Sequence, residues 1–192
     1  GRLGADGRPQ PGLGGLPPAW LDNDFMAAAL RRAASGSGLR DSSVRYGDPG
    51  GDPQLRQVLA ARLQAQGIAA TPAQIVTTVG ATQALDIVSR TLLKPGDTVM
   101  VEEPGWSVEF ARLSALGMRL LPVPRGPDGP DLAVMARYCE AHAGTAQAPR
   151  LFVSVTVLHN PPGYCLSPAP AHRVLQLAQP PHFHIVEAVT HH

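Results

Sequence analysis

The sequence contains almost no lysine and no excess of charge of either sign. Of its 192 residues, 16 are basic and 15 are acidic, and Lys94 is the only lysine. The formal net charge of +1 offers no electrostatic attraction for nucleic acid or for an anionic membrane surface. Chemistry that needs a lysine amine must therefore use Lys94 or a lysine from outside these residues.

Cysteines and long apolar runs are also scarce. Cys139 and Cys165 are isolated and lack a CxxC spacing, so neither a metal knuckle nor a disulfide scaffold is indicated. No apolar run approaches the roughly 20 residues that span a bilayer, and the chain does not open on a basic-then-apolar signal segment. A cytoplasmic location is the expectation. The glycine at position 1, in place of a methionine, indicates a processed or excised segment.

The composition that remains is that of a globular protein, with 44% hydrophobic and 16% charged residues. Residues 1–18 are dense in glycine and proline and predict a linker or a surface arm. Residues 22–34 have helix-forming composition, with an acidic start and a basic end that suit the helix dipole. Together they form a predicted N-terminal region, residues 1–40, and residues 36–51 are predicted to be a loop.

From residue 52 onward, predicted helices and strands alternate. A helix begins at Pro53, with Asp52 as its cap, and Gly67 ends it. The predicted strands that follow are residues 74–79, 98–103, 118–124, 150–157 and 182–189, and the helices between them are residues 81–93, 106–117, 131–143 and 167–178. Short apolar strands separated by helices favour parallel pairing, with helices on both faces. The predicted fold class is α/β with a mainly parallel sheet, in which ligands bind outside the carboxyl ends of the strands.

The first two strand ends carry residues suited to a flat, phosphorylated ligand. After the first strand, Gly80 permits a tight turn, and Ala81 and Thr82 open a helix whose free N–H groups, with the Thr82 hydroxyl, suit a phosphate. After the second strand, Trp106 follows a Pro-Gly turn at a helix start, where its ring could stack on a flat ligand. Taken alone, each has a plainer interpretation: an ordinary strand-to-helix turn and a packing tryptophan.

A third predicted strand ends abruptly in the stretch VLHNPPG. Asn160 precedes proline, which disfavours the helical region for its backbone, and two prolines and a glycine keep the turn stiff. We therefore predict that the turn aims the Asn160 amide at a ligand beyond the sheet. The plainer alternative is an ordinary turn asparagine.

In this order and spacing, these features resemble the fold-type I pyridoxal 5'-phosphate (PLP) enzymes of the aminotransferase class I and II family. The resemblance covers residues 40–187, through the stretches YGDPGG, VGATQALDIV, LLKPGDTVMVEEPGW and HNPPG. It is nearest to the branch in which an aminotransferase-like domain is fused to a GntR-type DNA-binding domain, the MocR regulators. It implies a three-layer sandwich, the PLP-dependent transferase-like large domain, present here in part as residues 41–192.

The resemblance also implies roles for individual residues. Ala81 and Thr82 would hold the cofactor phosphate, Trp106 would stack on the pyridine ring and Asn160 would hydrogen-bond the ring hydroxyl. Tyr46 is similar to the family tyrosine that reaches across a dimer interface to the neighbouring subunit's phosphate. The implied ligands are PLP and an amino acid or amine, and the implied assembly of the full-length parent is a homodimer.

Two departures from the family pattern concern the end of the chain. The family follows its last strand here with a motif such as E-D-D-x-Y, whose aspartate stabilises the protonated pyridine nitrogen and makes the ring an electron sink. In IVEAVTHH, Glu187 matches, Ala188 stands where the aspartate is expected, and His191 falls near the tyrosine position. An alanine cannot hold that proton.

The family's Schiff-base lysine is expected beyond residue 192, and Lys94 does not replace it. Lys94 follows a helix predicted to start at the ligand edge, and at about 1.5 Å per residue this helix carries it about 20 Å away. We therefore assign no catalytic residue. Transamination needs the lysine as covalent anchor and proton shuttle, so these residues alone are expected not to catalyse it.

Three hypotheses stay open on these grounds. The chain is a truncated PLP-binding, aminotransferase-like domain, or it is the effector-sensing domain of a MocR/GntR-type transcriptional regulator whose DNA-binding domain lies upstream. No helix-turn-helix is visible, so direct DNA binding is not predicted. The third hypothesis, metal binding by His182, His184, His191 and His192 with Glu187, is weak because most of these histidines stand at the chain terminus, and no metal ligand is assigned.

Overall fold

The computed structural model describes residues 20–21, 23–157, 159, 162–179 and 183–189. The chain divides into two compact units, residues 1–77 and residues 78–192. The boundary near residue 40 that the sequence suggests stays a prediction.

The first unit is helical in its described part. Its elements are α1 (Asn23–Ala34), α2 (Ser37–Ser43), α3 (Pro53–Ala65) and a short 3-10 helix, η2 (Pro72–Gln74). The Asp52 carboxylate accepts a hydrogen bond from the backbone N–H of Leu55 (2.8 Å), and Gly67 follows the helix with a φ of +83°. Both predicted boundaries of α3 are thereby confirmed.

The prediction of an unbroken loop over residues 36–51 is wrong, because α2 lies within it. Serine is a weak helix former in part because its hydroxyl competes for backbone groups. Here the hydroxyls of Ser42 and Ser43 donate to the carbonyls of Leu39 and Arg40, at 3.1 Å and 2.8 Å. The side chains therefore bond to carbonyls of the helix itself instead of interrupting it.

The predicted strand over residues 74–79 is also wrong. Pro72–Gln74 form η2, and the segment after it pairs with a loop, since the N–H of Thr77 donates to the carbonyl of Gly50 (3.0 Å). Val76 and Val79 are 60% and 88% exposed. An alternating apolar run predicts a strand only when a neighbour buries one face of it, and the described residues supply no such neighbour.

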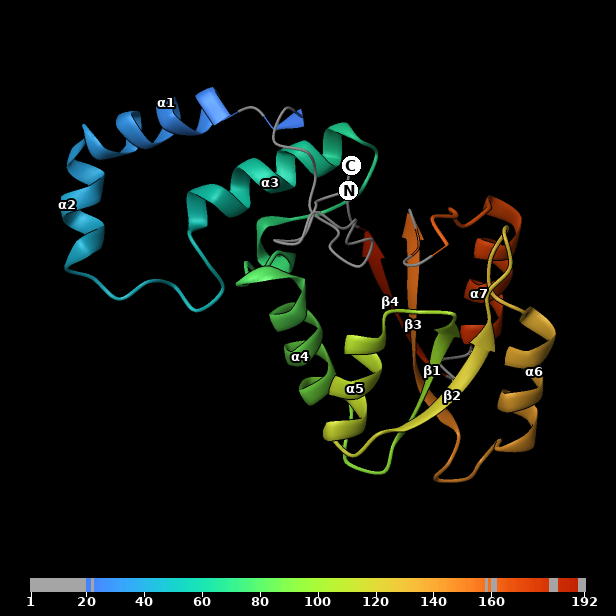
Figure 1. Ribbon diagram of the computed structural model, residues 1–192. Helices are drawn as coiled ribbons and strands as arrows, with labels where there is room; N and C mark the ends of the chain where they lie inside the picture. The colour runs from blue at the N-terminus through green and yellow to red at the C-terminus, as the bar shows by residue number, and fades with distance from the viewer. Residues whose placement is uncertain (1–19, 22, 158, 160–161, 180–182, 190–192) are drawn as a thin grey trace, which may run out of the picture. The chain divides into compact units, whose positions relative to one another are not determined.

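The second unit holds a parallel four-stranded sheet in the order β2-β1-β3-β4 (Figure 1). Its strands are β1 (Thr98–Glu103), β2 (Arg119–Pro124), β3 (Pro149–Val157) and β4 (His184–Val189), and its helices are α4 (Gly80–Leu92), α5 (Ser107–Ala115), α6 (Leu132–Ala141) and α7 (Pro168–Ala178). The predicted strands from residue 98 onward and the helices between them are confirmed to within a few residues.

Helices cover both faces of this sheet, with α4 and α5 on one side and α6 and α7 on the other (Figure 1). One core cluster joins Met100, Phe152 and Met135 with α7, and a second joins Val99, Val101 and Leu113 of α5. Consecutive residues of β1 thus enter opposite cores, as the pleat requires. The predicted three-layer α/β sandwich is confirmed, and every residue of β1 except Glu103 is buried.

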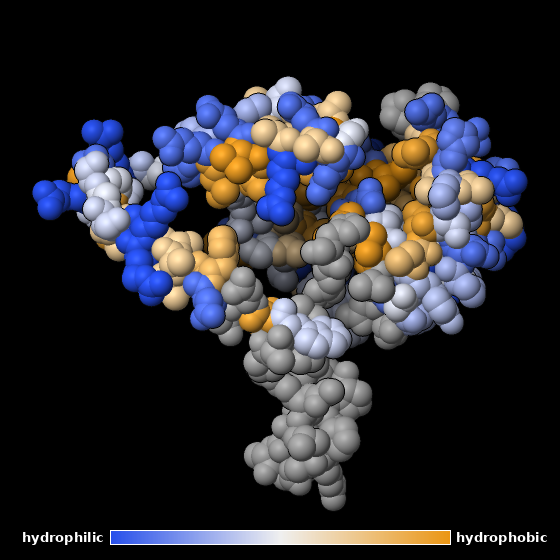
Figure 2. All heavy atoms as spheres, turned by 90° about the horizontal axis from the view of Figure 1, so that it is seen from above, coloured by the Kyte–Doolittle hydropathy of each residue, from blue (hydrophilic) through white to orange (hydrophobic). Residues whose placement is uncertain are grey.

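The surface mixes polar and apolar side chains. Figure 2 shows hydrophobic residues in orange among hydrophilic residues in blue. Apolar side chains that are more than half exposed include Trp20, Met26, Leu30 and Val58 of the first unit. None of the helices in the described part of the chain is both long and apolar enough to cross a membrane.

Candidate cofactor site

The sheet topology has a switch point at the carboxyl ends of β1 and β3. These two strands are neighbours, but the helix that follows β1, α5, packs on one face of the sheet and the helix that follows β3, α7, packs on the other. In open α/β sheets, ligands bind where the connections of adjacent strands diverge in this way. The candidate site is therefore the edge outside Glu103 and Val157.

Helix α4 begins at this same edge. A short connection joins the end of α4 to the start of β1, so the helix runs antiparallel to the strand and its first residues lie at the strand's carboxyl end (Figure 1). Gly80 has a φ of +80°, which favours glycine. Ala81 and Thr82 stand in the first helical turn, are exposed, and have N–H groups without an intrahelical acceptor. The Thr82 hydroxyl has no hydrogen bond to another described residue.

Trp106 stands at the start of α5, at the same edge, and is half-buried. The chain reaches it through Gly105, where a side chain has no room: a Cβ built there would lie 2.3 Å from the carbonyl oxygen of Glu102 and 2.5 Å from Cζ of Phe110. The glycine lets the loop pass closely over the end of β1. Gly105 thereby determines the position from which the Trp106 side chain extends.

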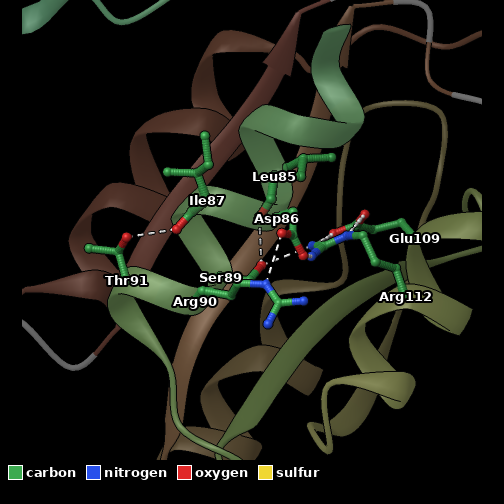
Figure 3. A network of polar contacts seen from close by, with 8 residues as sticks. All are labelled: Leu85, Asp86, Ile87, Ser89, Arg90, Thr91, Glu109 and Arg112. Carbon is green, nitrogen blue, oxygen red and sulfur yellow. Dashed lines mark hydrogen bonds and ion pairs between the residues drawn. The ribbon is translucent and has the colours of Figure 1, made fainter. Parts of the chain in front are cut away.

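A polar network ties α4 to α5 about one to two helical turns from Thr82 and Trp106 (Figure 3). Arg112 of α5 bonds to Glu109 (2.6 Å), to the Ser89 hydroxyl of α4 (2.9 Å) and to Asp86 (3.4 Å). The hydrogen bond to Glu109 is the main reason that the pKa of Arg112 is raised, so its charge is secure. The network keeps the starts of α4 and α5, and hence Thr82 and Trp106, in a defined spacing.

The turn after β3 is closed by the backbone of His159. Its N–H donates to the carbonyl of Tyr164 (2.9 Å), and its carbonyl accepts from the N–H of Gly163 (2.6 Å). The predicted site residue Asn160 follows directly but lies outside the described residues. Its role in binding stays a prediction.

Below this turn, a buried polar cluster joins the ends of three strands. Glu102 of β1 accepts from Arg125 Nη1 (2.7 Å), His159 Nε2 (2.7 Å) and the Ser154 hydroxyl (2.9 Å). The side chains of Arg125, Glu102 and His159 are at most 2% exposed. Arg125 Nε and Nη2 and His159 Nδ1 are buried with no hydrogen-bond partner in the described part of the chain.

When His159 is neutral, the cluster has no net charge, because Arg125 is its one cation and Glu102 is its one anion. Burial lowers the pKa of His159, the charge of Glu102 acts in the opposite direction, and the charge of Arg125 lowers the pKa further. A neutral imidazole that bonds Glu102 through Nε2 carries its proton on Nε2, which leaves Nδ1 as an acceptor. The Glu102–His159 contact is therefore a hydrogen bond from a neutral donor to a carboxylate.

We expect stability to fall as the pH is lowered through this titration. Because the folded-state pKa of His159 lies below the unfolded value of about 6.5, the unfolded chain binds the proton more readily, and folding loses free energy as the pH falls below about 6.5 until the folded-state pKa is passed. Urea midpoints between pH 8 and pH 5 measure this slope.

Two variants test whether His159 causes this pH dependence of stability. His159→Gln, which keeps an N–H donor but cannot titrate, is expected to flatten it, whereas the same change at exposed His172 is expected to leave it unaltered. Identical slopes in the wild type and His159→Gln would contradict the assignment of this titration to His159.

Comparison with known proteins identifies the family. Residues 21–187 match the family described as aminotransferase class I and II. The chain belongs to the aminotransferase class I and II family. Members of this family are PLP-dependent, which agrees with the resemblance seen in the sequence.

Relatives of this aminotransferase-like domain include both enzymes and regulators. The chain is 26% identical over 176 residues to YisV, an HTH-type transcriptional regulator from Bacillus subtilis, covering 92% of this chain and 34% of YisV. It is 30% identical over 166 residues to 2-aminoadipate transaminase from Thermus thermophilus, covering 85% of this chain and 38% of that protein. It spans between a third and two fifths of the length of these relatives.

A solved structure shows the same fold. LysN, an alpha-aminoadipate aminotransferase from Thermus thermophilus, is complexed with N-(5'-phosphopyridoxyl)-L-leucine and superposes with a TM-score of 0.75 at 30% identity, covering 91% of this chain and 42% of LysN. The aminotransferase-like domain is thus similar over most of its length to a protein whose structure contains a phosphopyridoxyl group.

Lys94 lies at the edge of the domain opposite the candidate site. It follows the last residues of α4 and precedes β1, its backbone N–H donates to Asp97 (2.8 Å), and its side chain is exposed. The 13 residues of α4 place it about 20 Å from Thr82. It is excluded as a residue that acts at this site.

The other predicted site residues are distributed unevenly. Tyr46 is fully exposed and belongs to the first unit. On β4, Glu187 accepts a hydrogen bond from the Thr156 hydroxyl (2.6 Å), and Ala188 follows it in the strand. His191 lies outside the described residues. No group of three or more metal-binding side chains gathers among the residues that the structure describes, and of the proposed histidine ligands only His184 is among them.

The sequence interpretation missed Glu102, Arg125 and His159. A signal existed, because TVMVEE is an inner strand in which only Glu103 is exposed, and a carboxylate buried inside it requires a cationic or hydrogen-bonding partner. Arg125 stands directly after the neighbouring strand, and His159 directly before the Asn160 that was singled out. The rule predicts that a partner exists, but only the strand order shows that these two residues lie next to Glu102.

Proposed function

We propose that this chain is the PLP-binding part of an aminotransferase-like domain, and that the edge outside β1 and β3 holds the cofactor. The observation that carries the proposal is that Thr82 and Trp106, which are 24 positions apart in the sequence, stand at the starts of two helices on that one edge. Family membership supplies the ligand class. When bound, PLP provides an electron sink for reactions at an amino-acid α-carbon.

The residues present fit two parts of the cofactor. The free N–H groups at the start of α4 and the hydroxyl of Thr82, which bonds to none of the described residues, suit the phosphate, and the half-buried Trp106 suits the pyridine ring. Ala81 contributes its backbone N–H, and Asn160 is proposed to bond the ring hydroxyl. The third part does not fit, since Ala188 offers no carboxylate to the pyridine nitrogen.

Replacing Thr82 with valine tests the phosphate contact. Removal of one hydrogen bond to a charged group costs about 1.5–3 kcal/mol, so the dissociation constant for PLP is expected to rise roughly ten- to hundred-fold. Quenching of tryptophan fluorescence or equilibrium dialysis measures it, with pyridoxal, which has no phosphate, as a second ligand that should be insensitive to the change.

Thr91→Val is the matched control, because Thr91 is exposed at the far end of the same helix and its hydroxyl donates to the carbonyl of Ile87. Equal losses of PLP affinity in Thr82→Val and Thr91→Val would overturn the placement of the phosphate.

We further propose that these residues bind PLP without covalent attachment and without transamination. Lys94, the only lysine, stands at the opposite edge of the sheet from the candidate site. The test is borohydride reduction at equimolar PLP, followed by peptide mass spectrometry. We expect no adduct at Lys94 of the kind that disappears when an excess of an amino acid is added. A stoichiometric adduct of that kind would contradict the geometry.

A second function is favoured by the relatives. YisV is an HTH-type transcriptional regulator, and the alternative proposal is that the domain senses an amino acid or amine for a MocR/GntR-type regulator whose DNA-binding domain lies upstream. The coding sequence on either side of these residues decides between the two, since a winged helix before residue 1 would favour the regulator.

The parent protein is proposed to be a cytoplasmic homodimer in which Tyr46 contacts the partner subunit's phosphate. The full exposure of Tyr46 supports this proposal, because the hydroxyl is free to meet another chain. Light scattering of the full-length parent, with PLP affinity measured in Tyr46→Phe, tests the shared site.

A further inference from the structure

We propose that the buried Glu102–His159 pair positions the turn between His159 and Tyr164, and that this one hydrogen bond, beyond general packing, sets how tightly the edge holds its ligand. His159 is a positioning residue in this account and touches no ligand itself. The effect on ligand affinity rests on the proposed PLP function. The effect on the turn does not.

The backbone of His159 controls both ends of the turn. Its N–H donates to Tyr164 and its carbonyl accepts from Gly163, at 2.9 Å and 2.6 Å. A displacement of this one residue therefore shifts two hydrogen bonds at once. Asn160, which is proposed above to bond the cofactor, follows His159 directly in the sequence, so we expect a shift of His159 to weaken cofactor binding.

The side chain of His159 makes one polar contact with the described residues. Nε2 lies 2.7 Å from Oε2 of Glu102, and Nδ1 has no partner in the described part of the chain. The residue is 1% exposed, so water cannot replace Glu102 as the acceptor. Loss of this bond would remove the one hydrogen bond that the imidazole makes with the described residues.

Glu102 is itself rigidly held, which makes it a suitable anchor. Its other oxygen accepts from Arg125 and from the Ser154 hydroxyl, and the N–H of Val155 points to Oε2 at 3.4 Å. Arg125 Nη1 also lies 3.3 Å from the carbonyl oxygen of Val155. The carboxylate is thus tied to the residues after β2 and to β3.

The same anchor serves the aromatic side of the site. Trp106 follows Glu102 by four residues, and the carbonyl oxygen of Glu102 is the atom that a Cβ built on Gly105 would meet most closely. Glu102 therefore helps to position both the loop to Trp106 and the turn after His159. The cluster is therefore proposed to set the spacing between the loop to Trp106 and the backbone of His159.

Two substitutions at one position separate this role from packing. His159→Gln keeps an N–H donor for Glu102, whereas His159→Met keeps the side-chain volume and removes the donor. Exposed His172→Met is the control. Because a hydrogen bond to a charged group is worth about 1.5–3 kcal/mol, His159→Met is expected to speed amide hydrogen exchange at Gly163 and at residue 159, the two amides that donate within the turn, roughly ten- to hundred-fold.

In the same experiment, His159→Gln is expected to stay within about threefold of the wild type, which is less than the loss of one such bond. Amides of β1 serve as the internal reference and are expected to be unchanged. Equal exchange at Gly163 in His159→Met and the wild type, or equally fast exchange in both variants, would overturn the proposal.

A measurement on the unaltered chain keeps the proposal testable if His159→Met fails to fold. Long-range proton–nitrogen correlation of the imidazoles at pH 7 is expected to show His159 as the neutral tautomer protonated on Nε2, with a slowly exchanging N–H. A His159 ring protonated on Nδ1 alone would overturn it, because Nε2 could then not donate to Glu102.

Ligand affinity completes the test and separates the two proposals. The PLP dissociation constant is expected to rise in His159→Met by the same roughly ten- to hundred-fold factor and to change little in His159→Gln. If the wild type itself binds no PLP, the proposed function fails while the exchange rates still decide the positioning role. If PLP binds and His159→Met binds it as tightly as the wild type, the link from turn to ligand is wrong.

Discussion

Glu102→Gln is expected to lower the free energy of unfolding by about 3–5 kcal/mol, the range found when one partner of a buried ion pair is removed. The change leaves Arg125 buried without its counter-charge, and the side chain of that arginine is fully buried. Domains of this size are stable by only about 5–15 kcal/mol, so the variant is expected to be partly unfolded at 37 °C. Urea unfolding followed by circular dichroism measures the difference.

The neighbouring carboxylate provides a matched control. Glu103 is exposed, at the end of the same strand, and Glu103→Gln is expected to change the free energy of unfolding by no more than about 0.5 kcal/mol. Similar losses in the two variants would show that the cluster at Glu102 has no special weight in the fold.

Gly105→Ala is the second change with a large expected effect, a loss of about 3 kcal/mol or more in the free energy of unfolding. The new Cβ would lie 2.3 Å from a backbone carbonyl oxygen and 2.5 Å from the ring of Phe110, and the backbone atom cannot move without distorting β1. The loop to Trp106 must shift, so PLP affinity is expected to fall as well. Chemical denaturation and fluorescence titration report the two effects.

Gly126→Ala is the control for that prediction, because a Cβ at Gly126 would meet nothing closer than 3.7 Å. It is expected to be close to neutral. If Gly105→Ala were as stable as Gly126→Ala, the loop before Trp106 would be more adaptable than the structure indicates.

The sheet could be predicted from the sequence because its strands are buried by one another. The runs that form β1 to β4 are short, apolar and separated by helices, so pattern and burial agree. The run over residues 74–79 has the same pattern, but Val76 and Val79 are exposed and Thr77 pairs with a loop. A sequence pattern shows that a strand is possible. Whether the strand forms depends on a neighbouring element that buries one of its faces.

The site could be predicted in part, for a related reason. Ala81, Thr82 and Trp106 stand at helix starts, which punctuation by glycine and proline marks in the sequence. The Glu102 cluster joins residues from three strand ends that are far apart in the chain, and its existence depends on the strand order β2-β1-β3. That order cannot be read from local pattern, so the partner of a buried carboxylate could not be named before the fold was known.

The central claim is that one edge of the sheet, outside β1 and β3, binds a flat phosphorylated ring. Nuclear magnetic resonance of the nitrogen-labelled chain during titration with PLP tests it most directly. The account predicts that the backbone signals of Ala81 and Thr82 and the indole signal of Trp106 shift together and saturate at one equivalent. Shifts confined to the opposite edge near Lys94, or to α6 and α7, with these three signals unchanged, would contradict it.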